Sequence, residues 1–344
     1  MKSLQTLLIA SLFGVATIPV SAQWEALPDT PPIPDDNPQT AEKVELGKVL
    51  FFDPRLSSTG TVSCNSCHNV MAGGEDNRPN SMGVDGKTGD RSAPTVWNSA
   101  FLSTQFWDGR APTLEEQARG PVTNPIEMGM KDWDMVVERL KSIPGYQPLF
   151  EAAFGNDNPI TADNAVKAIA VYERTLITPN SPFDRYTKGD KSAMTEQQVR
   201  GMNTFAKTGC LACHSGSNFS GPKLPMGNGW FMKFSSVPGS DYETKYKLLE
   251  DTGRHKVTGN EADKHLWRVP TLRNVALTAP YFHNGAVTTL EEAVRVMAKV
   301  QLDKDLDNAQ VEDIAAFLNA LTGEFPKQTM PRLPETPNKT VISP

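Results

Sequence analysis

The pentapeptide Cys64-Asn-Ser-Cys-His68 constrains this chain more than any other feature, and a second copy follows at Cys210-Leu-Ala-Cys-His214. Cys-x-x-Cys-His is the attachment sequence of a c-type haem, in which the two thiols bond to the porphyrin and the histidine binds the iron. All four cysteines of the chain lie in these motifs, so none is left for a disulfide or a catalytic thiol. The sequence therefore predicts two covalently bound haems. Their attachment residues are Cys64, Cys67 and His68 for the first, and Cys210, Cys213 and His214 for the second.

The first residues have the pattern of an export signal. Lys2 precedes an apolar run from Leu7 to Val20, and a small-residue cleavage site ends at Ala22. The run is short for a membrane span, and no later stretch is apolar for long enough to cross a bilayer. We therefore expect residues 1–22 to be a signal peptide and the mature protein to lie in the periplasm without a membrane span. Covalent haem attachment outside the cytoplasm agrees with this location.

The charge of the chain indicates the kind of partner it meets. There are 34 basic and 40 acidic residues, and cleavage of the signal removes a further lysine. A mildly acidic surface argues against a nucleic acid and suits a basic partner, such as a small cytochrome.

Several blocks of the sequence occur twice. Helical patterns at 40–52 and 195–207 both contain Gly-x-x-x-Phe shortly before a haem motif. A glycine one turn from an aromatic residue lets a helix pack closely against a neighbour. Further repeats then share a constant offset of 176 residues: 94–98 with 270–274, 106–109 with 282–285, and 113–116 with 289–292. The haem motifs are only 146 apart, so the second half has about thirty extra residues, which we expect to form long loops within 215–264.

These repeats predict an all-α fold of two cytochrome c-like domains, related by an internal duplication and joined by long loops. Further helical patterns cover 133–143, 162–176 and 308–321, whereas strand patterns are scarce. The Pro-rich stretch 178–182 separates the halves. The expected organisation is a signal peptide at 1–22, an N-terminal domain at 23–180, a C-terminal domain at 181–325 and a Pro-rich tail at 326–344.

The ligand opposite each histidine decides what each haem does. In the second half Met297 lies on an amphipathic helical pattern that starts near Thr289, and a thioether stabilises ferrous iron and suits electron transfer. Met226 and Met232 are rival ligands, and a helical methionine is usually a core residue. The residues alone leave the choice of the second axial ligand open.

The first half has Pro121 where the repeat places Met297, and offers Gln117 and Glu127 nearby instead. A carboxylate above an open iron can take a proton from one peroxide oxygen and return it to the other, while Gln117 orients the peroxide. A glutamate in such a loop is more often a solvated surface residue, so the residues alone leave this role open.

Over nearly its full mature length the chain resembles the bacterial dihaem cytochrome c peroxidases. The resemblance lies in the haem motifs and in the segments 50–57, 106–110, 125–128, 178–185 and 272–283. It implies a peroxidatic haem at His68 with Glu127 as acid–base residue and Gln117 beside it, and an electron-accepting haem held by His214 and Met297. It also implies that Trp107 lies between the haems. A calcium ion between the domains is expected on the carbonyl oxygens of Thr278 and Pro280, although the family's asparagine ligand is replaced by Ser92.

One departure from the family concerns the first haem. Many members have a histidine after the first motif that caps the resting iron, and the corresponding residue here is Val84. Valine cannot bind iron, so we expect this haem to be open or water-bound without reductive activation. Met71 and Met82 are the nearby soft side chains that could replace the cap.

The leading interpretation is therefore reduction of hydrogen peroxide with electrons from a small cytochrome c or cupredoxin, and the family leads us to expect a homodimer. One alternative is a dihaem oxidase that matures a tryptophan-derived cofactor in a partner protein. Such oxidases resemble this chain in an open first haem but have tyrosine in place of the methionine ligand. A second alternative is a plain dihaem electron carrier, with both irons closed and no acid–base residue.

Overall fold

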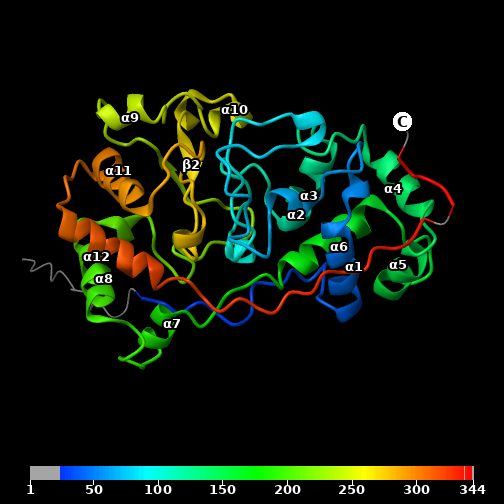
Figure 1. Ribbon diagram of the computed structural model, residues 1–344, viewed down its shortest axis with the longest axis horizontal. Coiled ribbons are helices and arrows are strands. Elements are labelled where there is room, and N and C mark those ends of the chain that lie inside the picture. Colours follow the sequence, from blue (N-terminus) through cyan, green and yellow to red (C-terminus); the bar gives the residue numbers. More distant parts are fainter. Residues whose placement is uncertain (1–23, 337, 343–344) are drawn as a thin grey trace, which may run out of the picture.

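The computed structural model describes residues 24–336 and 338–342, and the expected signal peptide at 1–22 lies outside them. Within this part the chain is mostly helical, as predicted, with one small antiparallel sheet (Figure 1). None of the described helices has the length and apolar character needed to cross a bilayer.

The helices of the first half are α1 (Ala41–Phe52), α2 (Cys64–Cys67), α3 (Leu114–Thr123), α4 (Trp133–Lys141), α5 (Tyr146–Phe154) and α6 (Ala162–Glu173). Those of the second half are α7 (Pro182–Thr187), α8 (Glu196–Thr208), α9 (Asp241–Lys245), α10 (His255–Thr258), α11 (Leu290–Leu302) and α12 (Asn308–Asn319). The strands are β1 (Phe231–Lys233) and β2 (Leu266–Arg268), paired with Phe231 opposite Arg268. Short 3₁₀ turns lie at Pro54–Leu56, Val84–Gly86, Ser99–Phe101, Cys210–Ala212, Glu261–Asp263 and Val275–Leu277.

The predicted helices are confirmed, with ends that follow local capping. Thr40 and Thr195 are N-caps, and each accepts a hydrogen bond from a backbone N–H in the first turn of α1 or α8. The helices predicted at 133–143, 162–176 and 308–321 each end two or three residues early. Sequence periodicity did not reveal α3, α5 or the short helices of the second half.

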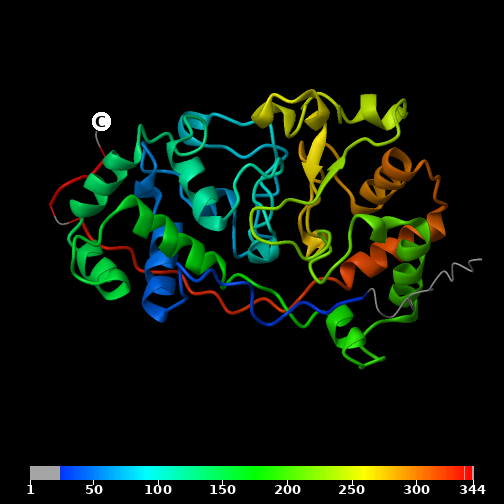
Figure 2. The same ribbon diagram turned by 180° about the vertical axis from the view of Figure 1, so that it is seen from behind.

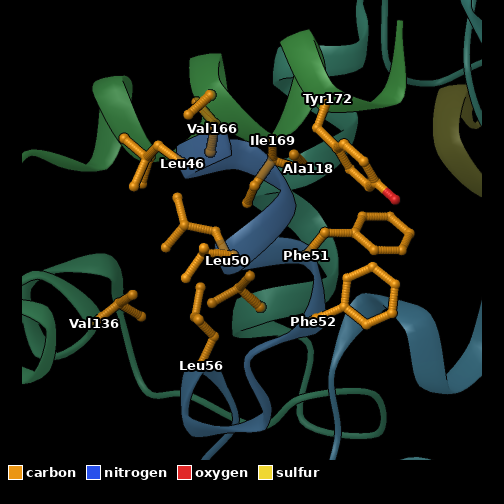
Figure 3. Packing of buried hydrophobic residues seen from close by; sticks show 14 of the residues in the cluster. Leu46, Leu50, Phe51, Phe52, Leu56, Ala118, Val136, Val166, Ile169 and Tyr172 are labelled. Atoms are coloured by element: carbon orange, nitrogen blue, oxygen red, sulfur yellow. The ribbon is translucent and has the colours of Figure 1, made fainter. Parts of the chain in front are cut away.

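Close packing of α1 against α6 builds the core of the first half. A methyl group on Gly47 would overlap the carbonyl oxygen of Ala168, so only glycine permits this approach. The apolar side chains of both helices belong to one buried cluster, in which the ring of Phe51 of α1 faces that of Tyr172 of α6 (Figure 3).

The second half repeats this arrangement with α8 and α12. A methyl group on Gly201 would overlap the carbonyl oxygen of Asp313, and the ring of Phe205 lies tilted against that of Phe317, with ring centroids 5.4 Å apart. The Gly-x-x-x-Phe patterns therefore mark the closest helix contact in each half, as predicted.

The segments repeated at an offset of 176 residues also share backbone geometry. Asn98 and Asn274 both have a left-handed conformation and precede a 3₁₀ turn, and both side chains donate a 2.8 Å hydrogen bond to the hydroxyl of Thr178. Phe106 and Phe282 are left-handed as well. These blocks therefore meet at one residue of the connection between the halves.

The extra residues of the second half are not all loop. Between 215 and 264 the chain forms β1, α9, α10 and a 3₁₀ turn, so the expectation of long loops is wrong in part. Pairing of β1 with β2 anchors the insertion, and α10 lies toward the first half (Figure 1).

The two ends of the described chain cross between the halves, along the lower edge in both views (Figures 1 and 2). Trp24 packs on Phe183, Phe219 and Phe317 of the second half before the chain reaches α1. The tail returns along the first half, where the carbonyl oxygen of Pro334 accepts a hydrogen bond from Arg55. Each half is therefore covered by a segment from the far end of the sequence.

The substitution Gly201→Ala tests the role of the close helix contact. Alanine exceeds glycine in helix propensity by about 1 kcal/mol, yet we expect a loss of about 1–3 kcal/mol because α12 must move away. Gly120→Ala in α3 is the matched control, since its methyl group would lie 3.5 Å from Phe106 and fit without movement. Thermal unfolding of both variants measures the difference, and equal midpoints would contradict the packing argument.

Candidate functional site

The first haem motif forms a one-turn helix beside a cavity. Cys64 and Cys67 begin and end α2, and the Nδ1 atom of His68 lies 3.0 Å from the carbonyl oxygen of Pro94. A carbonyl oxygen only accepts hydrogen bonds, so Nδ1 carries the proton and Nε2 keeps its lone pair for a metal. Burial also lowers the pKa of His68, which keeps the imidazole neutral.

The second motif has the same chemistry in a 3₁₀ turn at Cys210–Ala212. The Nδ1 atom of His214 lies 3.0 Å from the carbonyl oxygen of Phe219, and burial lowers the pKa of this imidazole as well. Both histidines are therefore oriented by the backbone and prepared to bind iron through Nε2.

The cysteines fit covalent attachment better than thiolate chemistry. None forms a disulfide, and burial raises the pKa of Cys67 to about 11 and that of Cys210 to about 12. Such thiols are poor metal ligands and poor nucleophiles at neutral pH. Beside apolar cavities they suit thioether bonds to a porphyrin.

A cavity of about 490 Å3 opens in front of His68, within the usual range of about 300–1,000 Å3 for small-molecule and cofactor sites. It brings together the residues predicted for the first haem: Cys67, His68, Trp107, Gln117 and Glu127. Cys64 does not line it and packs against the core of the first half instead.

Glu127 follows α3, whose residues include Gln117, and its side chain is held in place. Its Oε1 atom accepts a 2.7 Å hydrogen bond from the side-chain amide of Asn124. Burial raises the pKa of Glu127, and the positive charge of Arg110 partly opposes this shift. The carboxyl group is therefore a stronger base than an exposed glutamate.

Sequence reasoning missed several ionisable groups in this cavity, among them Arg110 and Glu173. Arg110 lies over the ring of Phe106 and pairs with Asp108 at 2.9 Å. Glu173 ends α6, and its buried Oε2 atom has no hydrogen-bond partner among the described residues. Burial raises the pKa of Glu173 to about 8, so it is mostly protonated at neutral pH. Its only signal was a charged residue at the end of an apolar helical pattern.

The region expected to cap the first haem lies elsewhere. Val84 is 1% exposed in the core of the first half, and its backbone N–H donates to the carbonyl oxygen of Glu127 at 2.9 Å. Met71 and Met82 are exposed and do not line the cavity. Among the described residues, His68 is the only histidine on the walls of this cavity, and no methionine lines it.

The second cavity, of about 240 Å3, lies in front of His214 and brings Cys210, Cys213 and Met297 to its walls. Met297 projects from α11, the helix predicted after Thr289. Met232 of β1 and His283 also line this cavity, whereas the rival ligand Met226 is exposed outside it.

Trp107 lines both cavities, and its indole Nε1–H donates a 2.8 Å hydrogen bond to the carbonyl oxygen of Ser92. Arg268 also lines both and was not singled out from the sequence. The wall between the cavities is therefore built from both halves of the chain.

The residues expected to bind calcium, Ser92, Thr278 and Pro280, all line the second cavity. No described backbone N–H donates to the carbonyl oxygen of Thr278 or Pro280. The described part of the chain has no cluster of three or more His, Cys, Asp or Glu side chains that could hold a metal. A cation here would therefore depend on carbonyl oxygens, which suit calcium.

Comparison with known proteins agrees with this geometry. Residues 41–192 match the family model described as di-haem cytochrome c peroxidase. Cytochrome c551 peroxidase of Nitrosomonas europaea is 44% identical over 90% of this chain and 88% of its own length. The chain belongs to the di-haem cytochrome c peroxidase family. Membership makes it an oxidoreductase and implies two c-type haems.

Other relatives show the range of this family. Cytochrome c551 peroxidase of Pseudomonas aeruginosa is 43% identical over 99% of both chains. The methylamine utilization protein MauG of Methylorubrum extorquens is 38% identical over 95% of this chain and 94% of its own. The crystal structure of a MauG-like protein associated with microbial copper homeostasis has a TM-score of 0.76 and 31% identity, covering 87% of this chain and 95% of that one.

The ligand opposite His214 can be identified by substitution. We expect Met297→Leu to abolish the sulfur-to-iron charge-transfer absorption of the ferric protein and to lower the potential of one haem, because a thioether favours ferrous iron. Met232→Leu is the matched control from the same cavity and should leave both unchanged. Loss of the absorption band in Met232→Leu but not in Met297→Leu would assign the ligand to Met232. Absence of the band in the unaltered protein would favour a different ligand, such as His283.

Proposed function

We propose that this protein reduces hydrogen peroxide to water at the cavity facing His68, with electrons received at the cavity facing His214. The observation that carries the proposal is the presence of a partly buried, oriented carboxyl group, Glu127, in the cavity of His68. The electron donor is a small periplasmic cytochrome c or cupredoxin, and each peroxide consumes two electrons and two protons.

The side chains of the first cavity manage the protons. Glu127 accepts the proton of the near peroxide oxygen and delivers it to the far oxygen, which leaves as water. Asn124 holds the carboxylate, and Gln117 orients the peroxide by hydrogen bonding. Arg110 faces the same space and compensates negative charge there.

When bound, haem supplies the redox chemistry, and the two cavities differ in what they offer it. Cys64, Cys67 and His68 would hold one haem, and apart from His68 no described histidine or methionine lines that cavity. Cys210, Cys213, His214 and Met297 would hold the other haem, which would supply electron transfer. Trp107 lies in the wall between them and shortens the path for electrons.

The remaining expectations belong to the same proposal. Residues 1–22 direct the chain to the periplasm, and the protein forms a homodimer. The domains at 23–180 and 181–325 descend from one duplicated cytochrome c-like unit, which the shared geometry at Asn98 and Asn274 supports. Calcium binds through the carbonyl oxygens of Thr278 and Pro280, near Ser92.

A second candidate function is oxidation of side chains in a partner protein, since two relatives are named MauG. The absence of a described capping residue in the first cavity favours this candidate as much as it favours a peroxidase. Met297 in the second cavity favours the peroxidase. A plain electron carrier would have no use for an oriented Glu127.

Substitution of Glu127 tests the proposed acid–base role. We expect Glu127→Gln to lower kcat for peroxide by about 10²–10⁴-fold, because the amide cannot accept the proton. Burial raises the pKa of Glu127, so the acid limb of the unaltered enzyme should lie above the pH expected for an ordinary glutamate. As the pH falls through this pKa, the carboxylate is protonated and the rate falls.

The matched control is Glu116→Gln, an exposed carboxylate on α3, the helix that precedes Glu127. Its kcat should equal that of the unaltered enzyme. An unchanged rate for Glu127→Gln would remove Glu127 from the mechanism, and no turnover with any donor would favour the carrier or the side-chain oxidase.

Spectra of the fully oxidised protein test the expectation that no side chain caps the iron of the first haem. We expect the fully oxidised protein to show a high-spin haem in its optical and EPR spectra and to react with peroxide without prior reduction, because Val84 is buried away from the cavity. Val84→His should introduce low-spin character at that haem if the loop can move to present it. Two purely low-spin haems in the unaltered protein would contradict the expectation.

A further inference from the structure

Arg268 connects the second half of the chain to the segment that contains Trp107. It is the last residue of β2, and its backbone N–H donates to the carbonyl oxygen of Trp107 at 2.9 Å. Its side-chain Nε donates to the carbonyl oxygen of Phe106, also at 2.9 Å. One residue therefore fixes two successive peptide groups of the other half.

The guanidinium of Arg268 is buried without a carboxylate partner. It is 4% exposed, and Nη1 donates to the carbonyl oxygen of Val269 at 3.2 Å, while Nη2 donates to no described residue. The carboxylate that acts on the guanidinium of Arg268 is that of Asp108. It is already paired with Arg91 at 2.5 Å and with Arg110 at 2.9 Å. Burial lowers the pKa of Arg268 to about 10, so it is still charged at neutral pH.

A buried cation that lacks a counter-charge is costly unless an anion completes the site. Among the described residues Arg268 is the one charged side chain that lines both haem cavities. Haem brings its own carboxylates in the form of propionate groups, and guanidinium recognises carboxylates through paired hydrogen bonds.

We propose that Arg268 is a shared counter-ion for propionate groups of the two haems and couples their reduction potentials while it positions Trp107. The inference rests on the two haems of the proposed function and does not depend on peroxide being the substrate. A fixed positive charge favours the ferrous form of a nearby haem, since reduction lowers the charge of the iron centre. Arg268 would therefore raise both potentials together.

The test is a spectroelectrochemical titration of the holoprotein. We expect Arg268→Gln to shift the midpoint potentials of both haems downward, and Arg268→Lys, which keeps the charge, to retain most of the original values. The thioether bonds keep both haems attached in the variants, and their content is measured independently of turnover. Arg268→Met is a second neutral variant of similar length, so the result does not depend on one substitution.

Arg254→Gln is the matched control. Arg254 also crosses between the halves and donates to the carbonyl oxygens of Asp108 and Gly109, but it lines neither cavity. Its loss should leave both potentials unchanged. Unchanged potentials in both neutral Arg268 variants would overturn the proposal. A shift in the midpoint potential of one haem alone would show that Arg268 is not a counter-ion shared by both haems. Loss of peroxide turnover with both potentials shifted as expected would count against the proposed function and leave this inference intact.

Discussion

The relative position of the two cavities depends on a buried hydroxyl group, that of Thr178. It accepts a 2.8 Å hydrogen bond from Asn98 in the first half and another from Asn274 in the second, and all three residues are fully buried. Each such bond contributes only about 0.5–1.5 kcal/mol, so their main effect is on geometry rather than stability. Both asparagines begin turns that lead into cavity walls, and a shift of either would change the distance between the haems. The connection between the halves therefore also fixes the position of one half relative to the other.

On this common frame the two cavities acquire opposite chemistry. The walls of the first include the carboxyl groups of Glu127 and Glu173, which can accept and donate protons, and the positively charged Arg110. The walls of the second are mainly apolar and include the thioethers of Met232 and Met297. Burial of Glu173 without a partner for its Oε2 atom is unfavourable, and a raised pKa of this kind is typical of functional sites. These walls are the basis on which we propose proton chemistry at the first cavity and electron transfer at the second.

Local patterns predicted much of this arrangement. The glycine in Gly-x-x-x-Phe located the closest helix contacts, because steric exclusion at Gly47 and Gly201 is a property of the residue itself. The haem motifs and the approximate position of Met297 followed from spacing. Arg268 and Glu173 could not be found in this way, since an arginine in a short strand and a glutamate at a helix end have no distinctive pattern. Their importance comes from burial and from contacts between residues far apart in the chain, as in the bonds from Arg268 to the segment of Phe106 and Trp107.

The insertion of the second half shows why such contacts matter for function. It was expected to form long loops, and the structure brings Lys256 and Val257 of α10 to the wall of the cavity of the first haem. Lys256 pairs with Asp251 at 3.1 Å, and Asp251 pairs with Arg91 of the first half at 2.8 Å. This ion-pair chain crosses the boundary between the halves beside the cavity. The two halves share the walls of the site where we propose that peroxide is reduced, so neither would form that site alone.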